Sequence, residues 1–191
     1  MRELVFATNN LHKAKEVQSK VKDAFKILNL EQIGCTEDIA ETGLTLEENA
    51  SIKSKYVYEN YHKDCFGDDT GLEIEALNHE PGVFSARYSG ERDPIKNMDL
   101  VLQKMDGITN RKARFRTVIS LIINKQEILF EGIVNGKIRT TASGTEGFGY
   151  DPIFEPEGYD ITFAEMVMEE KNAISHRGRA MEKLIAHLNS L

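Results

Sequence analysis

Apolar positions in the first part of the chain follow two different periods. The continuous apolar run 4–7 predicts a buried strand, and the run 25–30 predicts a second one. Between them, three apolar residues recur at helical spacing and predict a helix: Ala14, Val17 and Val21.

The middle of the chain carries one strand pattern between two helix signals. Residues 45–48 (Thr-Leu-Glu-Glu) have the spacing of a capping box, so we expect a helix from there to about Tyr61. The segment 72–77 alternates apolar and acidic residues, which predicts a strand with one buried face. Asp93-Pro94 has the residue types of a helix start, and this helix should end near Gly107.

The second half predicts more sheet and a last helix. The β-rich runs 114–123 and 127–134 are separated by three residues, which predicts an antiparallel hairpin, and 136–141 should continue the sheet. Ser175 has the residue type of an N-cap for a helix that follows it. The apolar face of that helix is predicted from three residues: Ala180, Leu184 and Leu188.

Composition limits the kind of protein. A chain of 191 residues suits one large domain or two small lobes, and the net charge of −7 argues against binding a nucleic-acid polymer, which needs a concentrated basic face. Cys35 and Cys65 lack metal-ligand spacing, so we expect neither zinc nor a disulfide, and a reduced cytoplasmic location fits best. No apolar run has the length of a signal peptide or a membrane span, so we expect neither.

Two adjacent carboxylates, Asp68 and Asp69, stand between Gly67 and Gly71. Like charges side by side repel each other unless a cation or a shared proton offsets the cost. The run 64–80 contains six acidic residues and no Lys or Arg, so its field would attract a divalent metal, for which Mg²⁺ is the natural candidate. An acidic turn on the solvated surface is the alternative.

Further polar stretches each allow a functional and a structural interpretation. The turn 8–13 would bind a phosphate at the start of a helix, or its two asparagines would cap it. The glycine-rich stretch 144–152 would stack a flat ligand on its aromatic residues, or pack them into the core. His176 and Arg177 would meet an anion in the first turn of the last helix, or lie at the surface. Lys53 would face solvent or a cleft.

Seven short motifs occur along the chain in the order expected of one family. They are Thr8-Asn9-Asn10-x-x-Lys13, Glu41-Thr42-Gly43-Leu44-Thr45, Glu48-Asn49-Ala50, Asp68-Asp69-Thr70-Gly71-Leu72, Pro81-Gly82-Val83-Phe84-Ser85-Ala86-Arg87-Tyr88, Gly147-Phe148-Gly149-Tyr150-Asp151-Pro152 and Lys171-Asn172-x-x-Ser175-His176-Arg177-Gly178. Together they resemble the inosine triphosphate pyrophosphatase family, and the resemblance covers nearly the whole chain. Thr70 departs from the family pattern, which more often has serine there.

The resemblance implies a fold and an activity. The fold would be an elongated α/β structure with a long mixed sheet flanked by helices, formed by residues 1–191 as a single domain with two lobes and a central active-site cleft. A homodimer is also implied. The implied activity is Mg²⁺-dependent hydrolysis of ITP, dITP or XTP to the nucleoside monophosphate and pyrophosphate.

The resemblance also implies roles for individual residues. Glu41 and Asp69 would hold the metal, and Asp69 is the predicted general base, with Asp68 supporting the metal or orienting the attacking water. The predicted substrate-binding residues are Thr8, Asn9, Asn10, Leu11, His12, Lys13, Lys53, Thr70, Phe148, Gly149, Tyr150, Asp151, Lys171, His176 and Arg177. Hydrogen-bond donors from His176, Arg177 or the loop backbone would favour the 6-oxygen of hypoxanthine and xanthine over the amino group of adenine.

Two alternatives remain open on the sequence alone, and the first comes from another functional class. One is a nucleotide-binding sensor that leaves the triphosphate intact. The other is an enzyme of the same chemistry that prefers a modified pyrimidine triphosphate.

Overall fold

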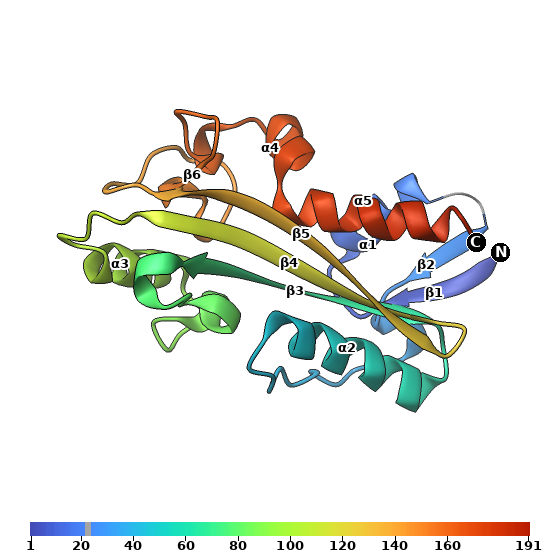
Figure 1. Cartoon of the computed structure of the whole chain (residues 1–191). Coiled ribbons are helices and arrows are strands. Elements are labelled where there is room, and N and C mark those ends of the chain that lie inside the picture. The colour runs from blue at the N-terminus through green and yellow to red at the C-terminus, as the bar shows by residue number, and fades with distance from the viewer. Residues whose placement is uncertain (22–23) are drawn as a thin grey trace. The chain divides into compact units, whose positions relative to one another are not determined.

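A computed structural model describes residues 1–21 and 24–191, without the side chains of His12 and Glu16. Within these residues, six strands form one mixed sheet in the order β2-β1-β3-β4-β5-β6, as Figure 1 shows. The strands are β1 (Arg2–Phe6), β2 (Phe25–Leu28), β3 (Cys65–Ile74), β4 (Lys112–Ile123), β5 (Gln126–Ile138) and β6 (Phe154–Pro156). Strand β1 pairs in parallel with β2 and β3, whereas β5 and β6 are antiparallel.

The described helices are α1 (Leu11–Lys20), α2 (Leu46–Tyr61), α3 (Pro94–Lys104), α4 (Met168–Ile174) and α5 (His176–Leu188). The predicted α/β fold is therefore confirmed. The described chain divides into two compact units. Unit 1 comprises Met1–Asp69, Val118–Glu131 and Ala180–Leu191, and unit 2 comprises Thr70–Thr117 and Gly132–Arg179.

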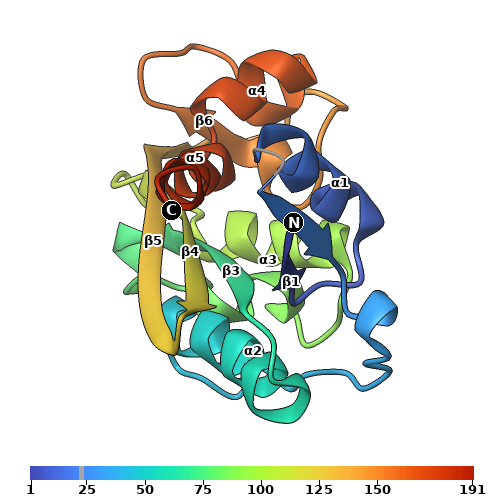
Figure 2. The same ribbon diagram turned by 90° about the vertical axis from the view of Figure 1, so that its right-hand side faces the viewer.

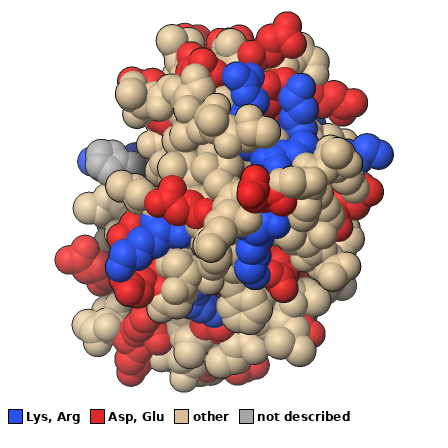
Figure 3. All heavy atoms as spheres, turned by 90° about the vertical axis from the view of Figure 1, so that its left-hand side faces the viewer, with Lys and Arg blue, Asp and Glu red and all other residues tan. Residues whose placement is uncertain are grey.

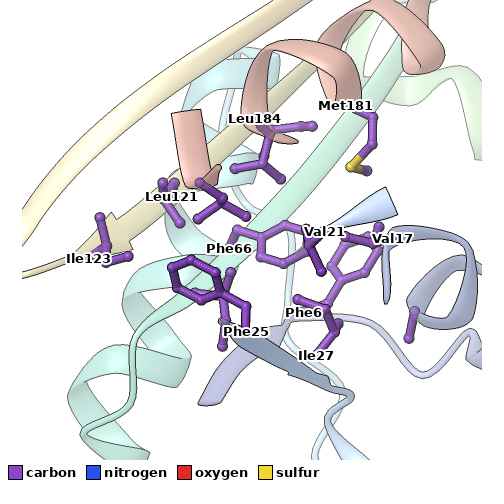
Figure 4. Close-up of a cluster of buried hydrophobic side chains, with 14 of the residues drawn as sticks. Phe6, Val17, Val21, Phe25, Ile27, Phe66, Leu121, Ile123, Met181 and Leu184 are labelled. Carbon is purple, nitrogen blue, oxygen red and sulfur yellow. The ribbon is translucent and has the colours of Figure 1, made fainter. Parts of the chain in front are cut away.

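The core of unit 1 lies on both faces of its part of the sheet. On one face, Phe6 and Phe66 stack on each other and meet residues of α1 and α5, among them Val17 and Leu184 (Figure 4). On the other face, Cys65 packs in a cluster with Val57 of α2. Figures 1 and 2 show the same arrangement, with α1 and α5 on one side of β1 and β3 and α2 on the other.

The core of unit 2 is built around three aromatic rings. Phe115 of β4 lies 4.6 Å from the ring of Phe154 and 6.1 Å from that of Phe163, measured between ring centroids. Helix α3 contributes Val101 to the same cluster, and Met105 follows it at the end of the helix. Aromatic pairs at such separations add to the free energy gained by burying their area.

Local signals for the helix starts are confirmed. The Thr45 hydroxyl accepts a hydrogen bond from Glu48 N, and the Asp93 carboxylate accepts from Ile95 N with Pro94 in the first turn. Ser175 Oγ accepts from Gly178 N at 3.1 Å. The hairpin is confirmed as well: β4 and β5 are neighbours in the sheet, and the two residues between them have positive φ, as a tight hairpin turn requires.

Several boundaries differ from the sequence prediction, and the largest difference is in β3. Strand β3 begins at Cys65 rather than at Leu72 and ends at Ile74, where a short 3₁₀ helix takes over. The prediction was wrong because Phe66 pairs with Phe6 of β1, and this pairing overrides the low strand propensity of Gly and Asp. Strand β2 ends at Leu28 rather than at residue 30. The predicted runs 127–134 and 136–141 form one strand, β5, which ends at Ile138. Helix α4, which carries Lys171, was not predicted.

The surface combines charges of both signs. On the face seen in Figure 3, Lys and Arg side chains lie between Asp and Glu side chains. Within unit 2, the buried carboxylate of Glu155 pairs with Lys137 at 2.7 Å and with Arg139 at 2.5 Å. Among the helices of the described chain, none is both long and apolar enough to cross a membrane.

We predict that Leu184→Ala lowers the free energy of unfolding by about 2–5 kcal/mol, because it leaves a cavity at a fully buried position between α5 and the sheet. Denaturant titration would measure this loss. The matched control is Leu129→Ala, where the side chain is 47% exposed and the expected change is within about 0.5 kcal/mol. Equal losses in both variants would contradict the placement of α5 in the core.

Candidate functional site

The two adjacent carboxylates lie within strand β3, so their side chains point to opposite faces of the sheet. Asp68 has the orientation of Phe66, which packs with α1 and α5, and Asp69 has that of Cys65, which packs near α2. The expectation that Asp68 and Asp69 act on one cation is therefore not supported by their placement. The strand gives them different surroundings.

On the α2 face, Asp69 lies within one polar group of unit 1. Asn49 Nδ2 donates to Asp69 Oδ2 at 3.0 Å, and Lys53 Nζ lies 4.0 Å from the other oxygen, Oδ1. Lys53 Nζ also donates to Glu41 Oε1 at 2.6 Å. The structure thus brings Glu41, Lys53 and Asp69 together, with the lysine side chain largely buried at 13% exposure.

Two glycines allow this close arrangement. A Cβ on Gly67 would lie 2.8 Å from Lys53 Cβ and 3.0 Å from Ala50 O, so helix α2 packs directly on the backbone of β3. Gly43 N donates to Asn49 Oδ1 at 2.8 Å, and a Cβ on Gly43 would lie 2.7 Å from the same oxygen. The loop that contains Gly43 and strand β3 are therefore held by the same asparagine.

Asn49 is a residue to which the sequence interpretation gave no role. It is fully buried, and its amide contacts both the loop that follows Glu41 and the carboxylate of Asp69. The motif Glu48-Asn49-Ala50 was the available signal, because a polar residue on the apolar side of a predicted helix needs a buried partner. An amide at this point fixes the orientation of the Asp69 carboxylate.

The donor set of this group suits a hard divalent cation. Carboxylate oxygens are the ligands that Mg²⁺ prefers, and Mg²⁺ commonly takes one or two of them together with waters and substrate phosphates. Glu41 and Asp69 provide these two carboxylates around the ammonium group of Lys53. No cluster of three or more His, Cys, Asp or Glu residues suited to a metal occurs among the described residues.

On the α1 face, Asp68 meets the turn at the start of the helix. Lys13 Nζ lies 3.3 Å from Asp68 Oδ2, and the carboxylate is almost fully buried. The turn is capped by its own side chains, since Asn10 N donates to Thr8 Oγ1 and Lys13 N donates to Asn10 Oδ1. Asn9 and Leu11 are exposed, and the predicted contact of His12 lies outside the described side chains.

In unit 2, the glycine-rich loop presents one exposed ring above a buried ion pair. Lys171 Nζ donates to Asp151 Oδ2 at 2.5 Å, and the same oxygen accepts from Phe148 N at 2.8 Å. The Lys171 ammonium lies 5.0 Å from the centre of the Phe148 ring. Phe148 is 71% exposed, and Gly149 beside it has a φ of 63°, so the backbone turns sharply at this point.

His176 lies in a buried position of the same unit. Its ring stacks on Phe115 with centroids 4.8 Å apart, and its Nδ1 has no hydrogen-bond partner among the described residues. Burial lowers the pKa of His176 from 6.5 to about 3, with a smaller contribution from the nearby charges of Arg177 and Lys171. The imidazole is therefore neutral at neutral pH, not an unpaired cation on the helix dipole.

Two other predicted contacts in unit 2 have internal partners. The hydroxyl groups of Thr70 and Thr117 lie 2.7 Å apart. Tyr150 is buried, and its hydroxyl donates to Ser85 O at 2.8 Å. Burial also raises the pKa of Tyr150. The side chain of Tyr150 therefore serves to hold the loop.

The predicted site residues are distributed over both units. Unit 1 contains residues 8–13, Glu41, Lys53 and Asp69, and unit 2 contains Thr70, residues 148–151, Lys171, His176 and Arg177.

Comparison with known proteins identifies the family. A model of the Ham1 family matches residues 4–187. The chain is 55% identical over 184 residues to a dITP/XTP pyrophosphatase of Flavobacterium psychrophilum, and the match covers 96% of this chain and 97% of that protein. The chain belongs to the Ham1 family. The resemblance in the seven motifs is thereby confirmed.

Solved structures of Ham1 relatives have the same fold. The Ham1 protein of Staphylococcus aureus superposes with a TM-score of 0.95 at 38% identity, over 99% of each chain. A nucleoside-triphosphatase / dITP/XTP pyrophosphatase of Mycobacterium abscessus superposes with a TM-score of 0.85 at 37% identity, over 95% of this chain and 98% of that one.

We predict that His176 does not titrate between pH 5 and pH 8, because its pKa in the folded chain is about 3. Below pH 6.5 the imidazole of His176 binds a proton in the unfolded chain but not in the folded chain. The free energy of unfolding therefore falls as the pH falls from 6.5 toward 3. NMR titration of the imidazole signals, with His176→Asn as the assignment control, would measure this. A midpoint near 6.5 would contradict the buried placement.

Proposed function

We propose that this Ham1-family chain is a nucleoside-triphosphate pyrophosphatase that hydrolyses ITP, dITP and XTP to the nucleoside monophosphate and pyrophosphate. The relatives named dITP/XTP pyrophosphatase support the substrate class and the reaction. The observation that carries the proposal is the group formed by Glu41, Lys53 and Asp69 on the α2 face of strand β3. Such a group combines a proton acceptor, a positive charge and two carboxylates suited to a cation.

Asp69 is the proposed general base. Asn49 donates to one of its oxygens, Oδ2, which leaves Oδ1 in a fixed orientation on the side of Lys53. A carboxylate held in this way can accept the proton of a water that attacks the α-phosphorus. Attack there releases pyrophosphate, because the bond that breaks joins the α-phosphorus to the oxygen that bridges to the β-phosphorus.

Mg²⁺ is the proposed cofactor, and Glu41 and Asp69 would hold it. When bound, it would neutralise phosphate charge and lower the pKa of a bound water. Lys53 would donate to a phosphate oxygen from the same group, and Lys13 would contribute a second positive charge from the turn at the start of α1. Residues 8–12 of that turn would offer polar side chains and backbone N–H groups to the triphosphate.

Residues of unit 2 are proposed to bind the nucleoside. The exposed ring of Phe148 would stack on the base, and Lys171, His176 and Arg177 would donate to its oxygens. A neutral imidazole donates from one nitrogen and accepts at the other, so its recognition of a base is directional. Adenine presents an amino group where hypoxanthine presents an oxygen, and it would leave these donors without partners.

The proposal includes the remaining predicted residues and the assembly. Thr70, Gly149, Tyr150 and Asp151 would complete the substrate site, the first through its hydroxyl and the others by shaping the loop. Residues 1–191 would act as one domain to which both units contribute. A homodimer in the cytoplasm is also proposed, and light scattering of the purified chain would test the dimer.

We predict that ITP, dITP and XTP yield pyrophosphate and the monophosphate with Mg²⁺, and that ATP and GTP react at least ~100-fold more slowly. Removal of divalent ions with a chelator should abolish turnover, because the charge of the triphosphate is then not neutralised. Product analysis across a panel that includes modified pyrimidine triphosphates would measure this. Orthophosphate as the first product, or an intact triphosphate as for a sensor, would contradict the proposal.

We predict that Asp69→Asn lowers kcat by at least ~100-fold while the fold is retained, because the amide can neither accept the proton nor bind a cation as well. The matched control is Asp99→Asn, which makes the same change on an exposed part of α3 and should keep normal turnover. Steady-state kinetics with a circular dichroism spectrum would measure both. Near-normal turnover of a folded Asp69→Asn variant would remove this residue from the mechanism.

A further inference from the structure

The motif 81–88 has no role in the site described so far. It forms a 3₁₀ helix, Gly82–Arg87, that packs on strand β3 within unit 2. A Cβ on Gly71 would lie 2.5 Å from Gly82 O, and Ile74 N donates to Glu80 O at 3.1 Å. The segment therefore lies against the backbone of β3 immediately after Thr70.

Ser85 connects this segment to the strand through its side chain. Its Oγ accepts from Leu72 N at 2.9 Å and donates to Gly82 O at 2.6 Å. Leu72 is fully buried, so water does not reach its N–H group. Ser85 Oγ therefore provides the hydrogen-bond acceptor that this N–H needs. One hydroxyl group thus satisfies the strand and closes the turn of the 3₁₀ helix.

The backbone of Ser85 connects the same segment to the glycine-rich loop. Tyr150 Oη donates to Ser85 O at 2.8 Å, and Tyr150 is only 5% exposed. The next residue, Asp151, accepts from Phe148 N at 2.8 Å. A continuous series of contacts therefore runs from β3 through Ser85 and Tyr150 to the backbone of Phe148, whose ring is exposed.

A buried asparagine anchors the segment from its other side. Asn97 of α3 donates from Nδ2 to Ala86 O at 3.2 Å, and its Oδ1 accepts from Ser89 N at 2.7 Å. Asn97 is 3% exposed. Because α3 and β3 both hold the segment, Ser85 O has a defined position toward which Tyr150 can direct its hydroxyl.

We propose that Ser85 is a positioning residue for base selection, which it serves by fixing the loop of Phe148 relative to strand β3. The proposal rests on the proposed function, in which Phe148 stacks on the base. Ser85 does not itself contact substrate. Its role is to keep the ring of Phe148 and the ion pair of Asp151 and Lys171 in one geometry. The site then cannot rearrange to bind a different base.

Hydrogen exchange of the free protein tests the positioning without any activity. In Ser85→Ala and in Tyr150→Phe, the amides of residues 144–151 should exchange about five- to tenfold faster. Tyr150→Phe removes the hydrogen bond between the loop and Ser85 O, and Ser85→Ala removes the two side-chain hydrogen bonds that hold Ser85 itself in place. Ser89→Ala is the matched control, since it removes a hydroxyl just after the segment, and the contact of this hydroxyl with Glu91 O is 3.5 Å long and exposed. Unchanged exchange in both test variants would overturn the proposal.

Base selectivity provides the second measurement. We expect Ser85→Ala to lower the ratio of kcat/KM for ITP to that for GTP by about tenfold or more, mainly through KM, with kcat for ITP within about threefold of the original. Partial unfolding does not change this ratio, because it removes active enzyme for both substrates equally. Ser85→Thr keeps the hydroxyl and should restore the ratio.

The outcomes separate the two proposals. If the unmodified chain hydrolyses none of these triphosphates, the proposed function fails, and the exchange experiment still decides whether Ser85 holds the loop. If the unmodified chain selects ITP and both Ser85→Ala and Tyr150→Phe keep its selectivity, the role of Ser85 in base selection is wrong. If Ser85→Ala does not fold, Tyr150→Phe decides alone.

Discussion

The alternation of side chains along strand β3 is the constraint on which the candidate site depends. Because successive residues of a strand point to opposite faces, Asp68 and Asp69 have different partners, although they are adjacent in sequence. Asp68 pairs with Lys13 beside α1, and Asp69 faces Asn49 and Lys53 of α2. A strand that carries one carboxylate on each face supplies an ion pair to the turn 8–13 and a second carboxylate, to which our proposal gives the catalytic role.

Close packing of α2 on β3 gives the second carboxylate its surroundings. Because Gly67 has no side chain, α2 packs directly on the strand backbone. Asn49 and Lys53 of the helix then lie close to Asp69. Partly buried carboxylates need positive charge nearby, and Lys53 provides it to both Glu41 and Asp69. A divalent cation bound at the same two carboxylates would lie close to the ammonium group of Lys53. In our proposal, Lys53 then donates to the phosphates of the substrate.

Local sequence signals predicted the parts of the fold that depend on neighbouring residues. The caps at Thr45, Asp93 and Ser175 and the hairpin between β4 and β5 are confirmed, because a cap or a tight turn is determined within a few residues. Pairing between distant segments was not predictable, so β3 was placed too late and the different surroundings of the two aspartates were missed. The partners of Asn49 and Ser85 were missed for the same reason, since Asp69 and Tyr150 are distant in sequence.

The central claim is that Asp69, and not Asp68, is a ligand of the divalent cation. Mn²⁺ is a suitable probe, because it prefers the same oxygen ligands as Mg²⁺ and its binding is visible by electron paramagnetic resonance. Titration of the unmodified chain, Asp69→Asn and Asp68→Asn with Mn²⁺ would test the claim directly. We expect Asp69→Asn to weaken binding by about tenfold or more and Asp68→Asn to change it by less than about threefold. Equal weakening in both variants, or weakening in Asp68→Asn alone, would contradict it.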